Sequence, residues 1–184
     1  MKRLLTLLSV FALTATVAAA DTGQGRKDLQ VFNDISKAVT RYAQFTIFDS
    51  VDASLKDGVV TLTGRVTMPY KKEAIEKRVA KVDGVRQVLD QITVLPVSQF
   101  DDQLRHRIAR AIYRNPNFWN YAIMADPPVH IVVENSRVTL TGVVQSEVER
   151  MLARSIATSQ FGVMSVTNDL KTDAEAKDAL EKAF

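Results

Sequence analysis

Apolar residues along this chain follow two different spacings, and the spacings come in a fixed order. Over residues 31–39 they recur every four positions between polar neighbours, which predicts an amphipathic helix. Over residues 51–55 and again over 60–66 they alternate with polar residues, which predicts two strands. Asp57-Gly58 separates the strands, and because both residue types tolerate the positive φ of a tight turn, we predict a hairpin.

A second helix and a third strand complete this unit. Pro69 suits the first turn of a helix, where a missing N–H costs nothing. Apolar residues at helical spacing follow over 74–82, and Gly84 ends the pattern. Apolar residues over 85–94 then predict a strand. The unit is therefore helix, strand, strand, helix, strand.

The same order returns later in the chain together with a short sequence. Val60-Thr61-Leu62-Thr63-Gly64 recurs at residues 138–142, 78 positions on. The units of a solenoid run about 20 to 50 residues, so this longer spacing indicates a small domain used twice. We predict an α+β fold of two small repeated domains, over residues 27–97 and 98–170.

Four glycines recur at equivalent places in the two copies: Gly64, Gly84, Gly142 and Gly162. In the predicted register, Gly64 and Gly142 share a strand face with the valine and leucine of the repeated motif. A glycine on a buried face leaves room for a close approach, which we assign to the helix that follows. All four glycines are therefore expected to be structural.

The copies differ most between the first helix and the first strand. The strands match at an offset of 78, whereas residues 31–39 match 104–112 at an offset of 73. Five residues are therefore added in the second copy, within residues 114–121. The inserted segment carries three aromatic residues: Phe118, Trp119 and Tyr121.

The two ends of the chain lie outside the repeat. Residues 1–20 combine a basic start, an apolar run and Ala18-Ala19-Ala20, which predicts a signal peptide cleaved after Ala20 and a periplasmic protein. The alternative is a membrane anchor, but the apolar run is shorter than the ~20 residues that span a bilayer. Residues 21–26 read as a polar linker. In the tail, residues 171–184, the Thr172-x-x-Glu175 spacing of a capping box predicts a short helix, although fraying is equally allowed.

Composition excludes several classes of function. Loss of Lys2 and Arg3 with the signal peptide lowers the formal net charge from +3 to +1. The sequence has no basic cluster of the kind that indicates a nucleic-acid partner. The absence of cysteine excludes disulfides, so each domain depends on its own apolar core. The two histidines, His106 and His130, have no metal-ligand partner at close spacing. We therefore expect no enzyme, no cofactor and no metal site.

The repeated motifs resemble those of the tandem BON-domain family of bacterial envelope proteins. The likeness rests on the doubled Val-Thr-Leu-Thr-Gly and on Gly-Val-x-x-Val at residues 84–88 and 162–166. It implies a three-stranded mixed sheet packed on two helices in each domain. It also implies a non-catalytic module that binds phospholipid or other envelope surfaces and is linked to osmotic or envelope stress. The family usually has asparagine after the second valine, and this chain has Asn168 but Asp90; we expect that position to accept a hydrogen bond.

A candidate lipid-binding site follows from charge and aromatic residues in the second copy. Arg107, Arg110 and Arg114 are spaced to share one side of its first helix, next to the inserted Phe118, Trp119 and Tyr121. Cationic side chains attract anionic headgroups, and aromatic residues settle at the membrane interface. The alternative is that Phe118 and Trp119 cover the core while the arginines pair with local acids.

We therefore expect a periplasmic envelope-stress protein that binds anionic phospholipid surfaces, or envelope proteins, through its second domain. No transmembrane span is expected after cleavage of the signal peptide, and the oligomeric state stays open. The alternative function is that of a periplasmic chaperone, a holdase that shields unfolded clients during osmotic stress.

Overall fold

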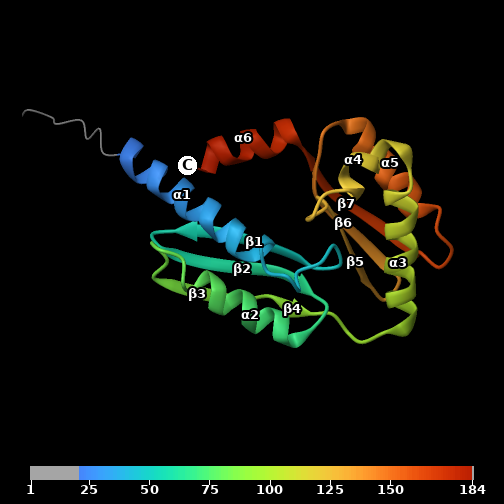
Figure 1. The fold of residues 1–184 in the computed structure, drawn as a ribbon, viewed down its shortest axis with the longest axis horizontal. Coiled ribbons are helices and arrows are strands. Elements are labelled where there is room, and N and C mark those ends of the chain that lie inside the picture. The colour runs from blue at the N-terminus through green and yellow to red at the C-terminus, as the bar shows by residue number, and fades with distance from the viewer. Residues whose placement is uncertain (1–20, 184) are drawn as a thin grey trace, which may run out of the picture.

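A computed structural model describes residues 21–183 and contains two α+β domains in tandem (Figure 1). The predicted signal peptide, residues 1–20, lies outside the described residues. Helix α1 (Asp21–Thr40) includes residues 21–26, so the expected linker is helical instead. No proline stands between residue 21 and the apolar stripe, so the segment can continue the helix despite Gly23 and Gly25.

The first domain has the predicted order of elements. After α1 come β1 (Ser50–Lys56), β2 (Val59–Val66), α2 (Pro69–Val79), β3 (Gln87–Asp90) and β4 (Thr93–Val94). Strands β1 and β2 are antiparallel, and β3 and β4 both pair parallel with β2. Asp57 and Gly58 form the hairpin with φ values of 51° and 75°.

The second domain repeats this order with additions. Its elements are α3 (Gln99–Tyr113), the 3-10 helix η1 (Pro116–Phe118), α4 (Trp119–Ala122), β5 (Val129–Glu134), β6 (Arg137–Val144), α5 (Glu147–Thr158) and β7 (Ser165–Thr172). Strand β5 is antiparallel and β7 parallel to the central β6. Helix α6 (Asp173–Ala183) follows, and Thr172 and Glu175 make both hydrogen bonds of the capping box.

Each domain buries a core of its own between one face of its sheet and two helices. In the first domain Ile35 of α1 and Ile75 of α2 pack against Val60 and Leu62 of β2. In the second domain the helices are α3 and α5, which lie on the side of the sheet away from the first domain (Figure 1). The predicted α+β class with two repeated domains, each with a mixed sheet on two helices, is confirmed.

The reason for the strand glycines differs from the prediction. A Cβ on Gly64 would collide with the carbonyl oxygen of Ser50 on the paired strand, and one on Gly142 with that of Pro128. The close neighbour is therefore the main chain at the start of the first strand, or of the residue just before it, and not the following helix. Gly64 and Gly142 also have φ values of 117° and 113°, which side-chain-bearing residues rarely adopt.

The aspartate and asparagine after the second valine form different hydrogen bonds. Asp90 Oδ1 accepts from the main-chain N–H of Ile92 at 2.9 Å, which is the accepted bond that we expect. Asn168 instead donates from Nδ2 to the carbonyl oxygen of Arg150 at 2.9 Å, so the expectation is wrong there. The bond made by Asp90 stops the strand, which resumes as β4, whereas β7 continues through Asn168.

The two domains pack directly against each other. The loop before β1 lies along the edge strand β5, where the N–H of Ile131 donates to the carbonyl oxygen of Ile47 at 2.6 Å. Phe48 of the same loop packs on the second core. Arg65 Nε lies 3.3 Å from Glu134 Oε2. The repeats are therefore joined by main-chain, apolar and ionic contacts.

Candidate membrane-contact site

Helix α3 buries one face and turns arginines toward solvent on another. The buried face carries Leu104, Ile108 and Ile112. The residues predicted to bind lipid, Arg107, Arg110 and Arg114, are three and four positions apart and so follow one side of the helix. We call these three residues the arginine face. Arg110 and Arg114 are exposed, and Arg107 is half-buried.

The arginine face carries uncompensated positive charge. Among the described residues 21–183, none of its arginines forms an ion pair. Asp102 on the same helix pairs instead with Arg105, whose Nη1 lies 2.9 Å from Asp102 Oδ1. Arg107 donates from Nη1 to the carbonyl oxygen of Phe161 at 2.7 Å. The alternative in which these arginines pair with local acids is therefore wrong.

A shallow polar depression lies over this helix. Its volume is about 490 Å³, and Asp102, Gln103, His106, Arg107 and Arg110 line it. Guanidinium groups at the rim of such a depression suit the phosphate oxygens of a lipid headgroup. The depression and the arginine face therefore lie on the same helix and share Arg107 and Arg110.

The insertion places two of its three aromatic residues in the core. Phe118 is 0% and Tyr121 4% exposed, with their ring centroids 6.0 Å apart. Phe118 and Tyr121 were predicted as lipid-binding candidates, and that prediction is wrong. The inserted segment packs against α3, and burying two large rings there removes apolar surface from water.

Tyr121 fixes the insertion to the start of α5. Its hydroxyl donates to Glu149 Oε2 at 2.7 Å and accepts from the N–H of Gln145 at 2.9 Å. Burial and the bond to Glu149 raise the pKa of Tyr121 to about 12. The phenol is therefore neutral at physiological pH and acts as a structural link.

In the first domain an ion pair makes the equivalent link between the loop after the first helix and the start of the second helix. Lys71 occupies the position equivalent to Glu149, and its Nζ lies 2.7 Å from Asp49 Oδ2. The Asp49 carboxylate also accepts hydrogen bonds from Thr46 and Thr67. Both domains thus tie the loop after their first helix to the start of their second helix.

Trp119 points the other way and is 64% exposed. Ile123 and Met124 are also exposed, at 73% and 46%. Trp119 and Ile123 are four residues apart, a spacing that brings side chains to one side of a helical segment. We call Trp119, Ile123 and Met124 the Trp119 projection. The alternative in which Trp119 covers the core is therefore wrong.

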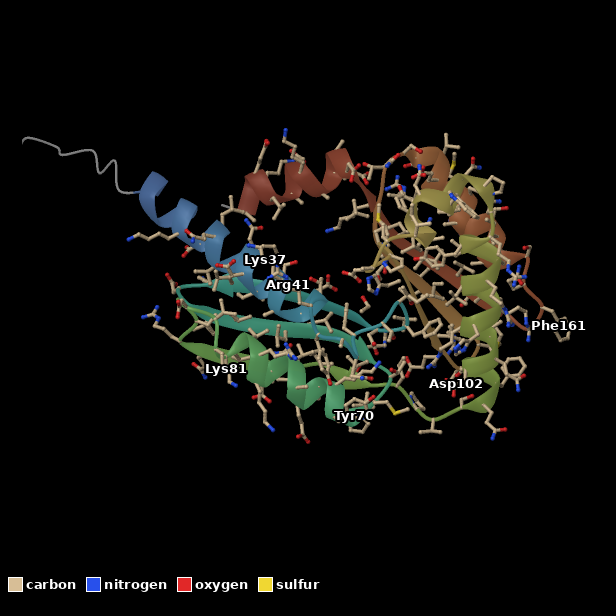
Figure 2. The ribbon with its side chains drawn as sticks, in the orientation of Figure 1. Lys37, Arg41, Tyr70, Lys81, Asp102 and Phe161 are labelled. Atoms are coloured by element: carbon tan, nitrogen blue, oxygen red, sulfur yellow. The ribbon has the colours of Figure 1, made fainter. Side chains whose placement is uncertain are left out.

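The turn between α5 and β7 adds an apolar projection that the sequence reading missed. Phe161 is 85% and Met164 73% exposed, and Figure 2 shows Phe161 projecting past α3. We call these two residues the Phe161 turn. The equivalent residues of the first copy are the charged Asp83 and Arg86. This change from charged to apolar residues is the sequence signal that could have identified the turn.

Each histidine lies close to a main-chain carbonyl oxygen. His106 Nδ1 lies 2.8 Å from the carbonyl oxygen of Asp102, and His130 Nδ1 lies 2.6 Å from that of Asp49. Within residues 21–183 no three His, Cys, Asp or Glu side chains are grouped as a metal ion requires. None of the helices in that range is both long and apolar enough to cross a bilayer.

Comparison with known proteins identifies both repeats. Residues 34–96 and 100–174 each match the family described as BON domain. The polyribonucleotide nucleotidyltransferase of Dehalococcoides mccartyi is 30% identical over 104 residues, which are 56% of this chain and 14% of that protein. The chain therefore spans a small fraction of the length of this curated relative.

Two solved structures of CdsD, a structural protein of the type III secretion system of Chlamydia trachomatis, align at low similarity. Its C-terminal domain is 12% identical with a TM-score of 0.28, covering 77% of this chain and 96% of that one. The second structure is 13% identical with a TM-score of 0.30, covering 82% and 97%. Similarity at these scores supports no conclusion about this protein.

Proposed function

The chain belongs to the BON-domain family, and from this premise we propose that its second domain binds anionic phospholipid surfaces through the arginine face of α3. BON domains are associated with phospholipid binding and with envelope stress. We further propose that the protein acts in the periplasm without catalysing a reaction, with the predicted signal peptide supporting its export.

One observation carries the proposal: the unpaired arginine face lies between two exposed apolar projections. Arg107 contacts the Phe161 turn through its hydrogen bond to the Phe161 carbonyl oxygen. Arg114 caps α3 at the other end, from which the chain runs into the Trp119 projection. At 1.5 Å per residue, Arg107 and Arg114 are about 10 Å apart along the helix. This layout suits a helix that lies flat on a bilayer.

The magnitudes favour reversible surface binding. Each basic residue near an anionic surface contributes about 1 kcal/mol, and burying one large apolar side chain contributes about 1.5 to 3 kcal/mol. Stable anchoring usually needs more than one such signal. Three arginines and two apolar projections supply several such signals, whereas the arginines alone or the apolar projections alone would give weak binding.

Vesicle co-sedimentation of the full chain tests the proposal. We expect binding to vesicles that contain phosphatidylglycerol and little binding to vesicles of phosphatidylcholine alone. Arg110→Gln and Trp119→Ala should each weaken the binding several-fold. Undiminished binding by Trp119→Ala would remove the Trp119 projection from the site, and absence of binding to the anionic vesicles would refute the proposed function.

The first domain offers matched control variants. Tyr70 is 51% exposed on α2, and Arg41 is exposed just after α1. Both lie on the first domain, away from the Phe161 turn (Figure 2). Tyr70→Ala and Arg41→Gln remove an exposed aromatic residue and an exposed charge, and we expect both to leave vesicle binding unchanged.

The holdase alternative is favoured by exposed apolar side chains outside the proposed membrane contact. Val97 is 95%, Val148 67% and Met151 58% exposed, and such side chains contact unfolded segments in a client protein. Suppression of client aggregation that persists in Trp119→Ala, together with unchanged lipid affinity, would favour this function over membrane binding.

A further inference from the structure

A half-open pocket of about 290 Å³ lies on the second sheet next to the first domain. Its lining forms two adjacent rows across the three strands, Val132–Thr139–Thr167 and Glu134–Arg137–Ser165. Asn135 of the hairpin and Arg65 of β2 complete the wall. The pocket therefore exists only where the two domains meet.

Strand geometry turns these rows away from the core. Successive side chains of a strand point to opposite faces, and Val133, Val138 and Leu140 are buried against α3 and α5. The alternate residues 132, 134, 137 and 139 must face the other side. The pocket thus opens on the face of the sheet opposite to the arginine face of α3.

The polar groups of this pocket are mostly unused. Arg65 Nε lies 3.3 Å from Glu134 Oε2, which neutralises that pair. In the part of the chain that the structure describes, the side chains of Arg137, Thr139, Ser165 and Thr167 form no hydrogen bond or ion pair with protein. One guanidinium and three hydroxyl groups therefore converge with their donors free.

The fold does not require these residue types. In the first domain the positions equivalent to Arg137 and Thr167 hold Val59 and Leu89, which sit in the same register on β2 and β3. The equivalent sheet therefore forms with apolar residues at both places. The Arg137 guanidinium and the Thr167 hydroxyl are therefore additions of the second domain, whereas Thr139 has a threonine, Thr61, at the equivalent place.

We propose that this pocket binds a small, water-soluble phosphate ester that carries hydroxyl groups. A guanidinium recognises phosphate oxygens with paired N–H donors, and the three hydroxyl groups supply further donors. The Glu134 carboxylate, held by Arg65, accepts hydrogen bonds from the hydroxyl groups of the ester. The volume is at the lower limit of the roughly 300 to 1,000 Å³ typical of ligand pockets, so the ligand is small.

The position of the pocket shows that its ligand is not a lipid headgroup of a membrane bound at the arginine face. A bilayer against the arginine face of α3 lies on the other side of the second domain and cannot reach the pocket. Val132, 3% exposed, is the one apolar residue of the lining. The pocket therefore has no surface for an acyl chain.

Titration of the ¹⁵N-labelled full chain with glycerol 3-phosphate, followed by amide chemical shifts, tests the site. We expect saturable shifts at Thr139, Ser165 and Thr167, and none with glycerol. Shifts that do not saturate, or equal shifts with glycerol, would overturn the proposal. A short-chain phosphatidylglycerol serves as the lipid arm, and tighter binding of it than of glycerol 3-phosphate would overturn the choice of a soluble ligand.

Substitutions that introduce the residues found at the equivalent positions of the first domain are expected to preserve the fold, so that a loss of binding can be assigned to the pocket. Arg137→Val and Thr167→Leu introduce the residues that the equivalent sheet already carries. We expect Arg137→Val to weaken binding at least about tenfold, the effect of losing a charge-assisted hydrogen bond. Arg154→Gln on α5 removes an exposed arginine outside the pocket and should bind as the parent does. Equal affinity of Arg137→Val and the parent would overturn the proposal.

The ligand pocket and the membrane-contact site can be refuted independently of each other. Arg137→Val should leave vesicle co-sedimentation unchanged, because the arginine face of α3 is intact. Loss of vesicle binding in Arg137→Val with no change in glycerol 3-phosphate binding would contradict the pocket and support a wider membrane surface.

Discussion

The main-chain N–H of Ile131 donates to the carbonyl oxygen of Ile47, with 2.6 Å between nitrogen and oxygen. Ile131 lies on β5, an edge strand of the second sheet, and Ile47 lies in the loop before β1. The loop thus occupies a donor that an open sheet edge would offer to another chain. The loop before β1 therefore both packs the two domains together and covers the edge strand β5.

Removing the apolar part of this joint should loosen the domains. The ring centroids of Phe48 and His106 are 4.7 Å apart, and Phe48 packs on the second core. We expect Phe48→Ala to lower the free energy of unfolding by roughly 1 to 3 kcal/mol and to let the domains tumble separately in ¹⁵N relaxation. Tyr70→Ala is the control; a single shared correlation time in Phe48→Ala would contradict a joint that depends on this ring.

The buried Asp49 carboxylate should make the first domain sensitive to acid. Burial raises the pKa of Asp49, but hydrogen bonds from Lys71, Thr67 and Thr46 outweigh it and lower the pKa below 3.8. A depressed pKa contributes stability above the unfolded-state value, which is lost as pH falls through the folded-state value. We therefore expect unfolding free energy to drop below about pH 4, and this part of the slope to vanish in Asp49→Asn.

Lys71 should be costly to remove. Its Nζ is buried beside Asp49, so Lys71→Met leaves a carboxylate without its counter-charge. Breaking a buried pair in this way costs about 3 to 5 kcal/mol. Chemical denaturation measures the change, with the exposed Lys77→Met on the same helix as control; equal stability of the two variants would show that the pair contributes little.

Tyr121→Phe should weaken the link between the insertion and α5. The variant loses the hydrogen bond to the Glu149 carboxylate, whereas the Gln145 N–H keeps Glu149 Oε2 as an acceptor. Loss of one hydrogen bond to a charged group costs about 1.5 to 3 kcal/mol. Because the folded-state pKa is raised to about 12, this tyrosine's contribution is full below its unfolded value near 10 and is lost as pH rises toward 12. Alkaline unfolding curves that are unchanged by Tyr121→Phe would argue against the link.

Salt should separate the two kinds of membrane contact. Attraction between exposed arginines and anionic headgroups is screened as ionic strength rises, whereas burial of Trp119 is not. We expect Arg110→Gln to reduce the salt dependence of vesicle binding, and Trp119→Ala to lower affinity at every salt concentration without changing that dependence. Equal salt dependence in Arg110→Gln and the parent would place Arg110 outside the contact.

The order of elements, the duplication and the family could be predicted from sequence, because alternation, helical spacing and the repeated motif are local signals. Asp57-Gly58 is an example, since its turn needs no distant partner. The position of the five-residue insertion was equally readable, by comparing offsets between the copies. Local patterns thus determined the elements and where the copies differ.

Tertiary structure decided which side chains of the insertion are available. Phe118, Trp119 and Tyr121 are all aromatic, and only the packing of the insertion against α3, with the bond from Tyr121 to Glu149 of α5, buries two of them and exposes the third. The pairing of Lys71 with Asp49 and the joint at Ile131 likewise depend on segments far apart in sequence. Such contacts follow from how packed elements meet, and no residue spacing encodes them.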